Sequence, residues 1–151
     1  MRVFISADME GVTGIADPRD ILKQESDYAA GQELMVGDVN AAIEGALAAG
    51  ADEIVVNDSH WTMTNIPRRM LHDNARLIRG SSKRRLMMEG FSADHDVVFF
   101  VGYHAKAGTP QAVLNHTMYP QMLTRIHING QEVGEMGINA GLPKHYDVPV
   151  G

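Results

Sequence analysis

The fold can be predicted from one stretch of the chain, VFISADME, which occupies residues 3–10. A short apolar run followed by acidic residues is typical of a buried strand that ends in a polar loop. Similar apolar runs follow at Glu53 to Asn57 and at Asp96 to Val101, and a shorter one stands at Ala75 to Ile78. We therefore expect a sheet of short, buried strands.

Helical stretches are predicted between these strands. From about Ser26 to Ala49, apolar residues recur with the spacing of one helix face, and Gly50 provides a stop. A second helix is predicted near Lys83 to Glu89. A third is predicted from Glu135, after a hairpin with Asn129-Gly130 at its turn. Strands that alternate with helices predict the α/β class, with a mostly parallel sheet in a three-layer α/β/α arrangement.

Length and composition restrict the possible functions. The 151 residues suit one domain, residues 1–151. Hydrophobic residues make up 44% and charged residues 21%, a globular balance, and the net charge of -6 argues against a nucleic-acid partner. The absence of cysteine excludes disulfides and thiolate ligands, and no apolar run is long enough to cross a membrane. These features predict a cytoplasmic protein.

Acidic and imidazole side chains follow three of the predicted strands. Asp8 and Glu10 come after the first strand, His60 after the second, and His104 after the strand that ends at Val101. The carboxyl ends of parallel strands meet at one edge of the sheet, where open α/β folds bind ligands. Carboxylates combined with imidazoles favour zinc, manganese or cobalt over calcium and magnesium. The sequence therefore predicts a metal site at the C-terminal ends of the strands.

Each of these residues, taken singly, also has an ordinary structural interpretation. An aspartate after a strand commonly caps a helix or forms a turn, and a histidine in a glycine-rich loop commonly makes only hydrogen bonds. The agreement of three strands favours the metal site. Asp58 is interpreted as structural, either as a turn residue or as a partner that orients His60.

Five spaced motifs connect the chain to a known family. In chain order they are Asp8-Met9-Glu10-Gly11, Asn57-Asp58-Ser59-His60, Gly102-Tyr103-His104-Ala105, Asn115-His116-Thr117-Met118 and Gly134-Glu135-Met136-Gly137-Ile138-Asn139-Ala140. Together they resemble the D-aminopeptidase family of binuclear zinc metallopeptidases. Members of that family continue into a second region, so the resemblance implies that this chain is a truncated, N-terminal metal-binding portion.

The resemblance implies two zinc ions that share a bridging carboxylate. Asp8 would bridge both ions. Glu10 and His104 would complete one site, and His60 and Glu135 would complete the other. The residue patterns alone do not single out Glu135 as a ligand. The family's members assemble as ring-shaped homo-oligomers, which is the assembly expected of the full-length protein.

The activity implied is zinc-dependent hydrolysis of short peptides with a small N-terminal residue, D-alanine above all. Two zinc ions would activate a water molecule and hold the free amine of the peptide substrate. His116 matches the position proposed in the family as nucleophile. A role as general base or oxyanion partner is an equal alternative, because imidazole is seldom the acyl acceptor in metallopeptidases.

Two other functions remain open from the sequence. One is a non-catalytic module in which the metals only stabilise the fold and bind a small ligand. The other is a phosphatase of the haloacid dehalogenase type, because Asp8 to Thr13 resembles its nucleophile motif. That motif needs Asp where Glu10 stands, and a downstream Lys and acidic pair that we do not find.

Overall fold

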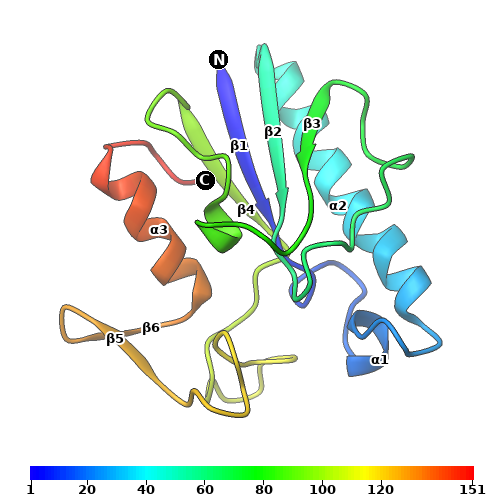
Figure 1. The fold of residues 1–151 in the computed structure, drawn as a ribbon, viewed down its shortest axis with the longest axis vertical. Helices are drawn as coiled ribbons and strands as arrows, with labels where there is room; N and C mark the ends of the chain where they lie inside the picture. Colours follow the sequence, from blue (N-terminus) through cyan, green and yellow to red (C-terminus); the bar gives the residue numbers. More distant parts are fainter.

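Four strands form a parallel sheet in the computed structural model, which describes residues 1–151 (Figure 1). Across the sheet they are ordered β3-β2-β1-β4. Their bounds are Arg2–Ala7 for β1, Glu53–Asp58 for β2, Ala75–Ile78 for β3 and Val97–Val101 for β4. β1 pairs in parallel with both β2 and β4, so the loops after these three strands emerge side by side at one edge.

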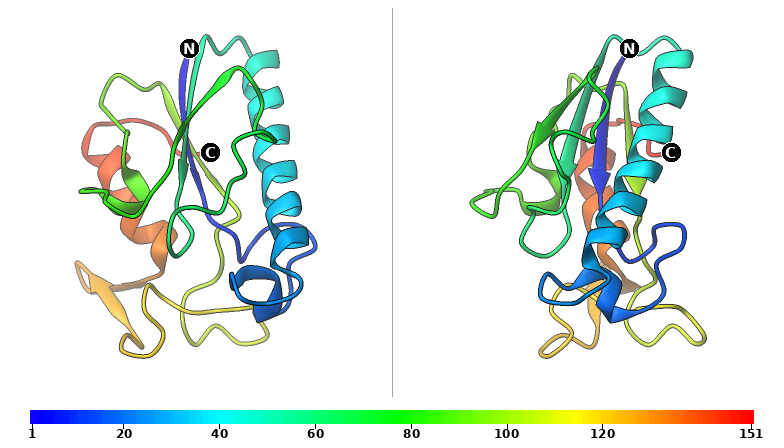
Figure 2. Two further views of the ribbon diagram at one scale, coloured as in Figure 1. Left: turned by 45° about the vertical axis from the view of Figure 1, so that its right-hand side comes forward. Right: turned by 90° about the vertical axis from the view of Figure 1, so that its right-hand side faces the viewer.

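Helices cover the two faces of the sheet (Figure 2). α2 packs on one face, and the short 3-10 turn η1 and α3 lie on the other. A one-turn helix α1 precedes α2, and a small antiparallel hairpin precedes α3. The bounds are Pro18–Ile21 for α1, Tyr28–Ala48 for α2, Leu86–Met88 for η1, Ile126–Ile128 for β5, Gln131–Val133 for β6 and Glu135–His145 for α3.

The alternation of side chains along β1 produces this layering. Val3 and Ile5 belong to the larger core cluster, in which Met35 and Val39 of α2 are also fully buried. Phe4 points the other way, into the smaller cluster that includes residues near η1 and the end of the chain. Both faces of the strand are therefore apolar, as a sheet covered on two sides requires. The predicted α/β class with a mostly parallel sheet is confirmed.

The prediction of a helix near Lys83 to Glu89 is wrong. Only η1 forms there, and Leu86 has a φ of 48°, which no α-helix accommodates. The Nζ of Lys83 donates to the carbonyl of Asp58 at 2.6 Å, so the segment is held against the end of β2. The charged residues of this segment favour a helix, but the contact with the end of β2 holds the segment as a loop.

The last residues of the chain lie along the outer edge of β4. Val150 forms an isolated parallel bridge with Val98. Val148, two residues earlier, is buried in the smaller core cluster with Phe91 and Phe4. No helix of the protein combines the length and the apolar composition that crossing a membrane demands.

Candidate metal centre

The loops after β1, β2 and β4 are locked together by backbone hydrogen bonds that continue beyond the strands. The N–H of Asp8 donates to Val101 and that of Gly11 donates to Gly102, both at 2.8 Å. On the other side, the N–H of Ser59 donates to Ala7 at 2.7 Å. The side chains that follow these strands are therefore fixed relative to one another by the sheet.

Glu135 reaches the same place from a different direction. It is the first residue of α3, and its side chain is almost fully buried. A carboxylate at a helix N-terminus is stabilised by the helix dipole. Its Oε1 also accepts a hydrogen bond of 2.7 Å from the backbone N–H of Met118, in the loop between β4 and β5.

Two imidazoles face the carboxylates inside the buried cluster. Nδ1 of His60 lies 3.0 Å from Oε2 of Glu10 and 3.4 Å from Oδ1 of Asp8. Nε2 of His104 lies 3.2 Å from Oε1 of Glu135 and 3.6 Å from Oδ2 of Asp8. The two oxygens of Asp8 thus face two different histidines. Asp8 is the shared member of the two halves of the cluster.

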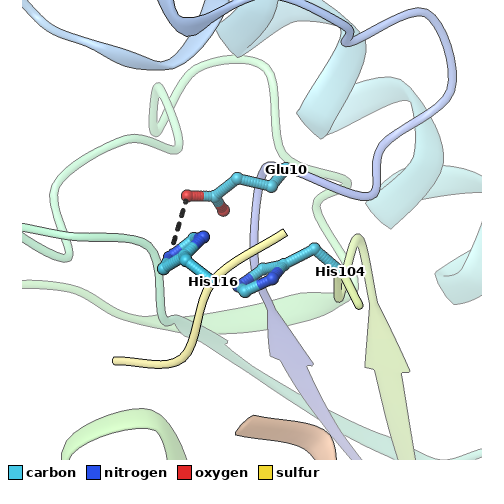
Figure 3. Close-up of side chains that lie close together, drawn as sticks. All are labelled: Glu10, His104 and His116. Atoms are coloured by element: carbon cyan, nitrogen blue, oxygen red, sulfur yellow. Dashed lines mark ion pairs between the residues drawn. The ribbon is translucent and has the colours of Figure 1, made fainter. Parts of the chain in front are cut away.

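His116 completes the constellation from the loop between β4 and β5. Its Nε2 lies 3.6 Å from Glu135 and 3.8 Å from Glu10, and Figure 3 shows its ring against that of His104. The ring centroids are 3.9 Å apart and the planes differ by 11°. The side chain of His116 is 20% exposed, against 1% for His104. His116 is therefore the imidazole that solvent or a substrate can reach.

The six residues named from the sequence are brought together in one place. They form three overlapping groups whose ligand atoms lie within 4.8 Å of one another: Asp8 with Glu10 and His60, Asp8 with His104 and Glu135, and Glu10 with His104 and His116. The implied pairing of Glu10 with His104 occurs among these groups. His60 and Glu135 share no group, since each lies nearest to a different partner.

Backbone carbonyls hold the outer nitrogen of all three imidazoles. The contacts are His60 Nε2 with Ile21 O at 3.1 Å, His104 Nδ1 with Ala105 O at 2.9 Å and His116 Nδ1 with Leu114 O at 2.8 Å. A carbonyl oxygen only accepts, so each outer nitrogen carries the proton. The inner nitrogen of a neutral ring then presents its lone pair to the carboxylates. Metal-binding histidines are commonly oriented in this way.

The cluster also contains buried polar atoms without a hydrogen-bonding partner. Oδ2 of Asp8 and Nε2 of His104 make no hydrogen bond of acceptable geometry. Both side chains are at most 3% exposed. A buried polar group without a partner costs free energy, and these two atoms face one another across the cluster. The donor set of carboxylate oxygens and imidazole nitrogens therefore fits zinc, which would satisfy both.

The electrostatics of the cluster point the same way. Burial raises the pKa of Asp8 to about 8, and the charge of Glu10 adds to the rise. Burial opposes ionisation of Glu10 too, but hydrogen bonding and charge from His60 lower its pKa to about 2. Burial also disfavours charged imidazoles, yet the carboxylates raise the pKa of His60 to about 10 and that of His104 to about 9. At neutral pH, the raised pKa values keep protons on Asp8, His60 and His104. A metal ion that bound these side chains would displace those protons.

Asp58 is a turn residue, and its carboxylate hydrogen-bonds to Asn65 and Ile66 rather than to the His60 ring. Its Oδ2 accepts from the backbone N–H groups of Asn65 and Ile66, at 2.5 Å and 2.7 Å. The amide of Asn65 in turn donates to the carbonyl of His60. Of the two structural interpretations of Asp58, the structure supports the turn, because the outer nitrogen of His60 is held by Ile21.

Three polar residues beneath the cluster were not singled out as functional by the sequence patterns. Tyr103, Asn139 and Ser6 are joined by hydrogen bonds, and Ser6 is fully buried inside β1. A serine within an otherwise apolar strand is the signal that could have drawn attention to them. Nothing in the sequence shows that a tyrosine and an asparagine far along the chain meet it.

Comparisons with known proteins identify the family of this chain. The family profile described as D-aminopeptidase, peptidase family M55, matches residues 1–151. The chain belongs to the D-aminopeptidase family. A relative from Bacillus subtilis (strain 168), named D-aminopeptidase, is 38% identical over 150 residues. The alignment covers 99% of this chain and 54% of the relative, so the chain spans about half the length of that protein.

A solved structure has the same fold. It is described as the Zn-dependent D-aminopeptidase DppA from Bacillus subtilis, a self-compartmentalizing protease. The TM-score is 0.96 and the sequences are 38% identical, over 99% of this chain and 54% of that one. Membership in the family supports the resemblance drawn from the five motifs and leaves the phosphatase interpretation without support.

Proposed function

We propose that this chain is the metal-binding part of a zinc-dependent aminopeptidase that hydrolyses short peptides with a small N-terminal residue, D-alanine above all. The observation that carries the proposal is the buried cluster in which Asp8 Oδ2 and His104 Nε2 have no hydrogen-bonding partner. The relative described as a Zn-dependent D-aminopeptidase supports zinc as the metal and an N-terminal D-amino acid in the substrate.

Two zinc ions are the occupants that the cluster suits best, and Asp8 would hold both of them. Each oxygen of Asp8 faces a separate histidine, at 3.4 Å and 3.6 Å, which is how a bridging carboxylate is arranged. Glu10, His60, His104 and Glu135 would supply the remaining ligands. When bound, zinc supplies Lewis acidity, which polarises a scissile carbonyl and lowers the pKa of water toward neutrality.

His116 is the residue that would act on the substrate. Its Nδ1 is held by Leu114 O, so Nε2 is free to take up a proton or to attack the carbonyl. Nε2 faces the carboxylates of Glu10 and Glu135, at 3.8 Å and 3.6 Å, on the side where the metal cluster lies. A proton taken up by Nε2 can then pass to the leaving amine.

A hollow beside His116 gives a short peptide room to bind. Its volume is about 490 Å³, and its wall includes Lys106, Arg125 and Glu132. The carboxylates of the cluster would attract the ammonium group at the N-terminus of a peptide. The two cations would favour a free carboxylate at the other end, although both Lys106 and Arg125 also pair with Glu132, at 2.5 Å and 3.8 Å. Opposite charges at the two ends of the site suit a short, unblocked peptide.

A homo-oligomer is part of the same proposal. The structural relative is described as a self-compartmentalizing protease. We infer that the full-length protein assembles in copies of itself, in a ring that encloses the peptide sites.

The test combines metal analysis with hydrolysis by the full-length protein. We expect two zinc ions per chain, and loss of both in Asp8→Ala, while the exposed Asp73→Ala serves as control. A D-alanyl dipeptide should be hydrolysed and its N-acetylated form should not, because an amide nitrogen binds zinc poorly. A single ion that survives Asp8→Ala would exclude bridging. Bound zinc without hydrolysis of any free dipeptide would favour the non-catalytic module.

A further inference from the structure

A network of buried hydrogen bonds lies directly beneath the metal cluster. Oη of Tyr103 lies 2.8 Å from Oγ of Ser6 and accepts a bond of 2.9 Å from Nδ2 of Asn139. Oγ of Ser6 lies 2.7 Å from Oγ of Ser59 and donates to the carbonyl of Met87 at 2.6 Å. When the hydroxyl of Ser6 donates to Met87 O, its oxygen can accept from the hydroxyls of both Tyr103 and Ser59. One arrangement of protons thus satisfies the network.

Each side-chain member of the network is a near neighbour in sequence of one metal-ligand candidate. The pairs are Ser6 with Asp8, Ser59 with His60, Tyr103 with His104, and Asn139 with Glu135, four residues earlier on α3. Residues four apart on a helix lie on the same face. The network therefore joins the four segments that carry the ligands: the ends of β1, β2 and β4, and α3.

Helix α3 depends on this network more than the strand ends do. The strand ends are already joined by backbone hydrogen bonds, such as that from Asp8 to Val101. Beyond the contact of Glu135 itself with His104, the bond from Asn139 to Tyr103 ties α3 to the loop after β4, and Asn139 also contacts the sulfur of Met87 in η1. A shift of α3 would carry Glu135 away from His104, while Asp8 and His60 would stay in place.

We propose that Tyr103 is a positioning residue whose hydroxyl sets the distance between Glu135 and the ligands carried by the strands. This inference rests on the proposed zinc centre. The hydroxyl accepts from α3 and donates to β1, a double role that phenylalanine cannot fill. Its removal leaves the amide of Asn139 without an oxygen acceptor and frees the helix to move. The ion that Glu135 ligates would then be held less tightly.

The test is a chelator competition for zinc on the full-length protein with Tyr103→Phe and Asn139→Ala. Each variant should weaken binding of one ion by about 10–100-fold, the usual cost of removing a partner behind a ligand, and leave the other nearly unchanged. The double variant should lose no more than either single variant, because both remove the same link. Asn139→Ala also keeps the test decisive should Tyr103→Phe fail to fold.

Asn40→Ala is the matched control. It removes a polar link between α2 and the segment 70–72, where Asn40 bonds both Met70 and His72, away from the cluster. Its zinc affinity should match that of the unaltered protein. An equal loss in Asn40→Ala, or unchanged affinity in both test variants, would overturn the role of Tyr103. If the unaltered protein bound no zinc, the proposed function itself would fail.

Discussion

The three histidines of the site make similar hydrogen bonds but differ in how far their side chains are exposed to solvent. All three donate through the outer nitrogen to a backbone carbonyl and turn the inner nitrogen toward carboxylates. His60 and His104 are buried to 2% exposure or less, whereas His116 keeps 20%. The first two follow strands and are fixed by the sheet. The third lies on a loop, where groups that must approach a substrate are commonly found.

His116→Ala should therefore separate catalysis from metal binding. We expect the variant to keep its fold and both zinc ions, and to lose about 10²–10⁴-fold in dipeptide turnover, the usual contribution of a positioned acid or base. Zinc stoichiometry and turnover should be measured together, beside His104→Ala, which should lose metal. Loss of metal from His116→Ala would make it a ligand. Unchanged turnover would make it a plain loop histidine.

Some residues of the cluster could be predicted from the sequence patterns, and others could not. Asp8, Glu10, His60 and His104 could be named because each follows an apolar strand, and the edge of a parallel sheet gathers such residues. Glu135 follows a hairpin and opens a helix, and His116 lies in a loop, so no local pattern marked either one. They were identified only through the resemblance to a family. The Tyr103 contact depends on three-dimensional packing.

At the level of secondary structure, the crossing of two loops shapes the site. A side chain at Gly102 would place a Cβ only 2.2 Å from the carbonyl of Asp8, and the φ of Gly102 is +69°. On the opposite loop, a Cβ at Gly11 would lie 2.0 Å from the carbonyl of Tyr103. The loops after β1 and β4 can approach this closely because both lack a side chain at the crossing.

Gly102→Ala should disrupt the centre by more than backbone strain alone. A left-handed φ costs a non-glycine residue about 1–3 kcal/mol, and the clash with Asp8 adds to this cost. Gly50→Ala is the control, because Gly50 has a φ of +89° and nothing within 4 Å of a built Cβ. Thermal unfolding and zinc content should show a larger stability loss and a weaker zinc site for Gly102→Ala only. Equal effects of the two changes would rule out the steric explanation.

The elements themselves were predicted where periodicity was strong. The strands stand out as short continuous apolar runs, because both faces of the sheet are covered. The long helix α2 stands out because its buried residues recur with the helical period of 3.6. The predicted helix near Lys83 failed because helical propensity there is outweighed by a tertiary contact with the end of β2. The short helix α1 was not predicted, although Asp17 and Asp20 form a capping box around Pro18.

On the scale of the whole molecule, many large apolar side chains are exposed in one part of the chain. Those between residues 113 and 136 are Val113, Met118, Tyr119, Met122, Leu123, Ile128 and Met136. Exposed apolar surface is typical of protein interfaces. In the proposed homo-oligomer, a second copy of the protein would cover this surface.

Met122→Asp should accordingly weaken the assembly of the full-length protein. The side chain of Met122 is 77% exposed, so an aspartate there costs the folded chain little. A charge buried at an interface without a partner would be costly. Light scattering after size exclusion should show an oligomer for the unaltered protein and a smaller species for Met122→Asp. Gln121→Asp adds the same charge at an exposed neighbour. A monomeric unaltered protein would contradict the expectation.

The hydrogen bond from Met118 to Glu135 makes the loop between β4 and β5 a reporter of zinc occupancy. Zinc bound to the Glu135 carboxylate would fix it in this position, whereas without the ion only hydrogen bonds and the neighbouring imidazoles hold it. The loop would then be anchored less firmly. Chelation should then speed tryptic cleavage after Arg125, relative to cleavage after Arg68, which lies on another exposed loop. Equal acceleration at both sites would indicate general unfolding. The rate of tryptic cleavage after Arg125 would thus report the metal content of the protein before any substrate is added.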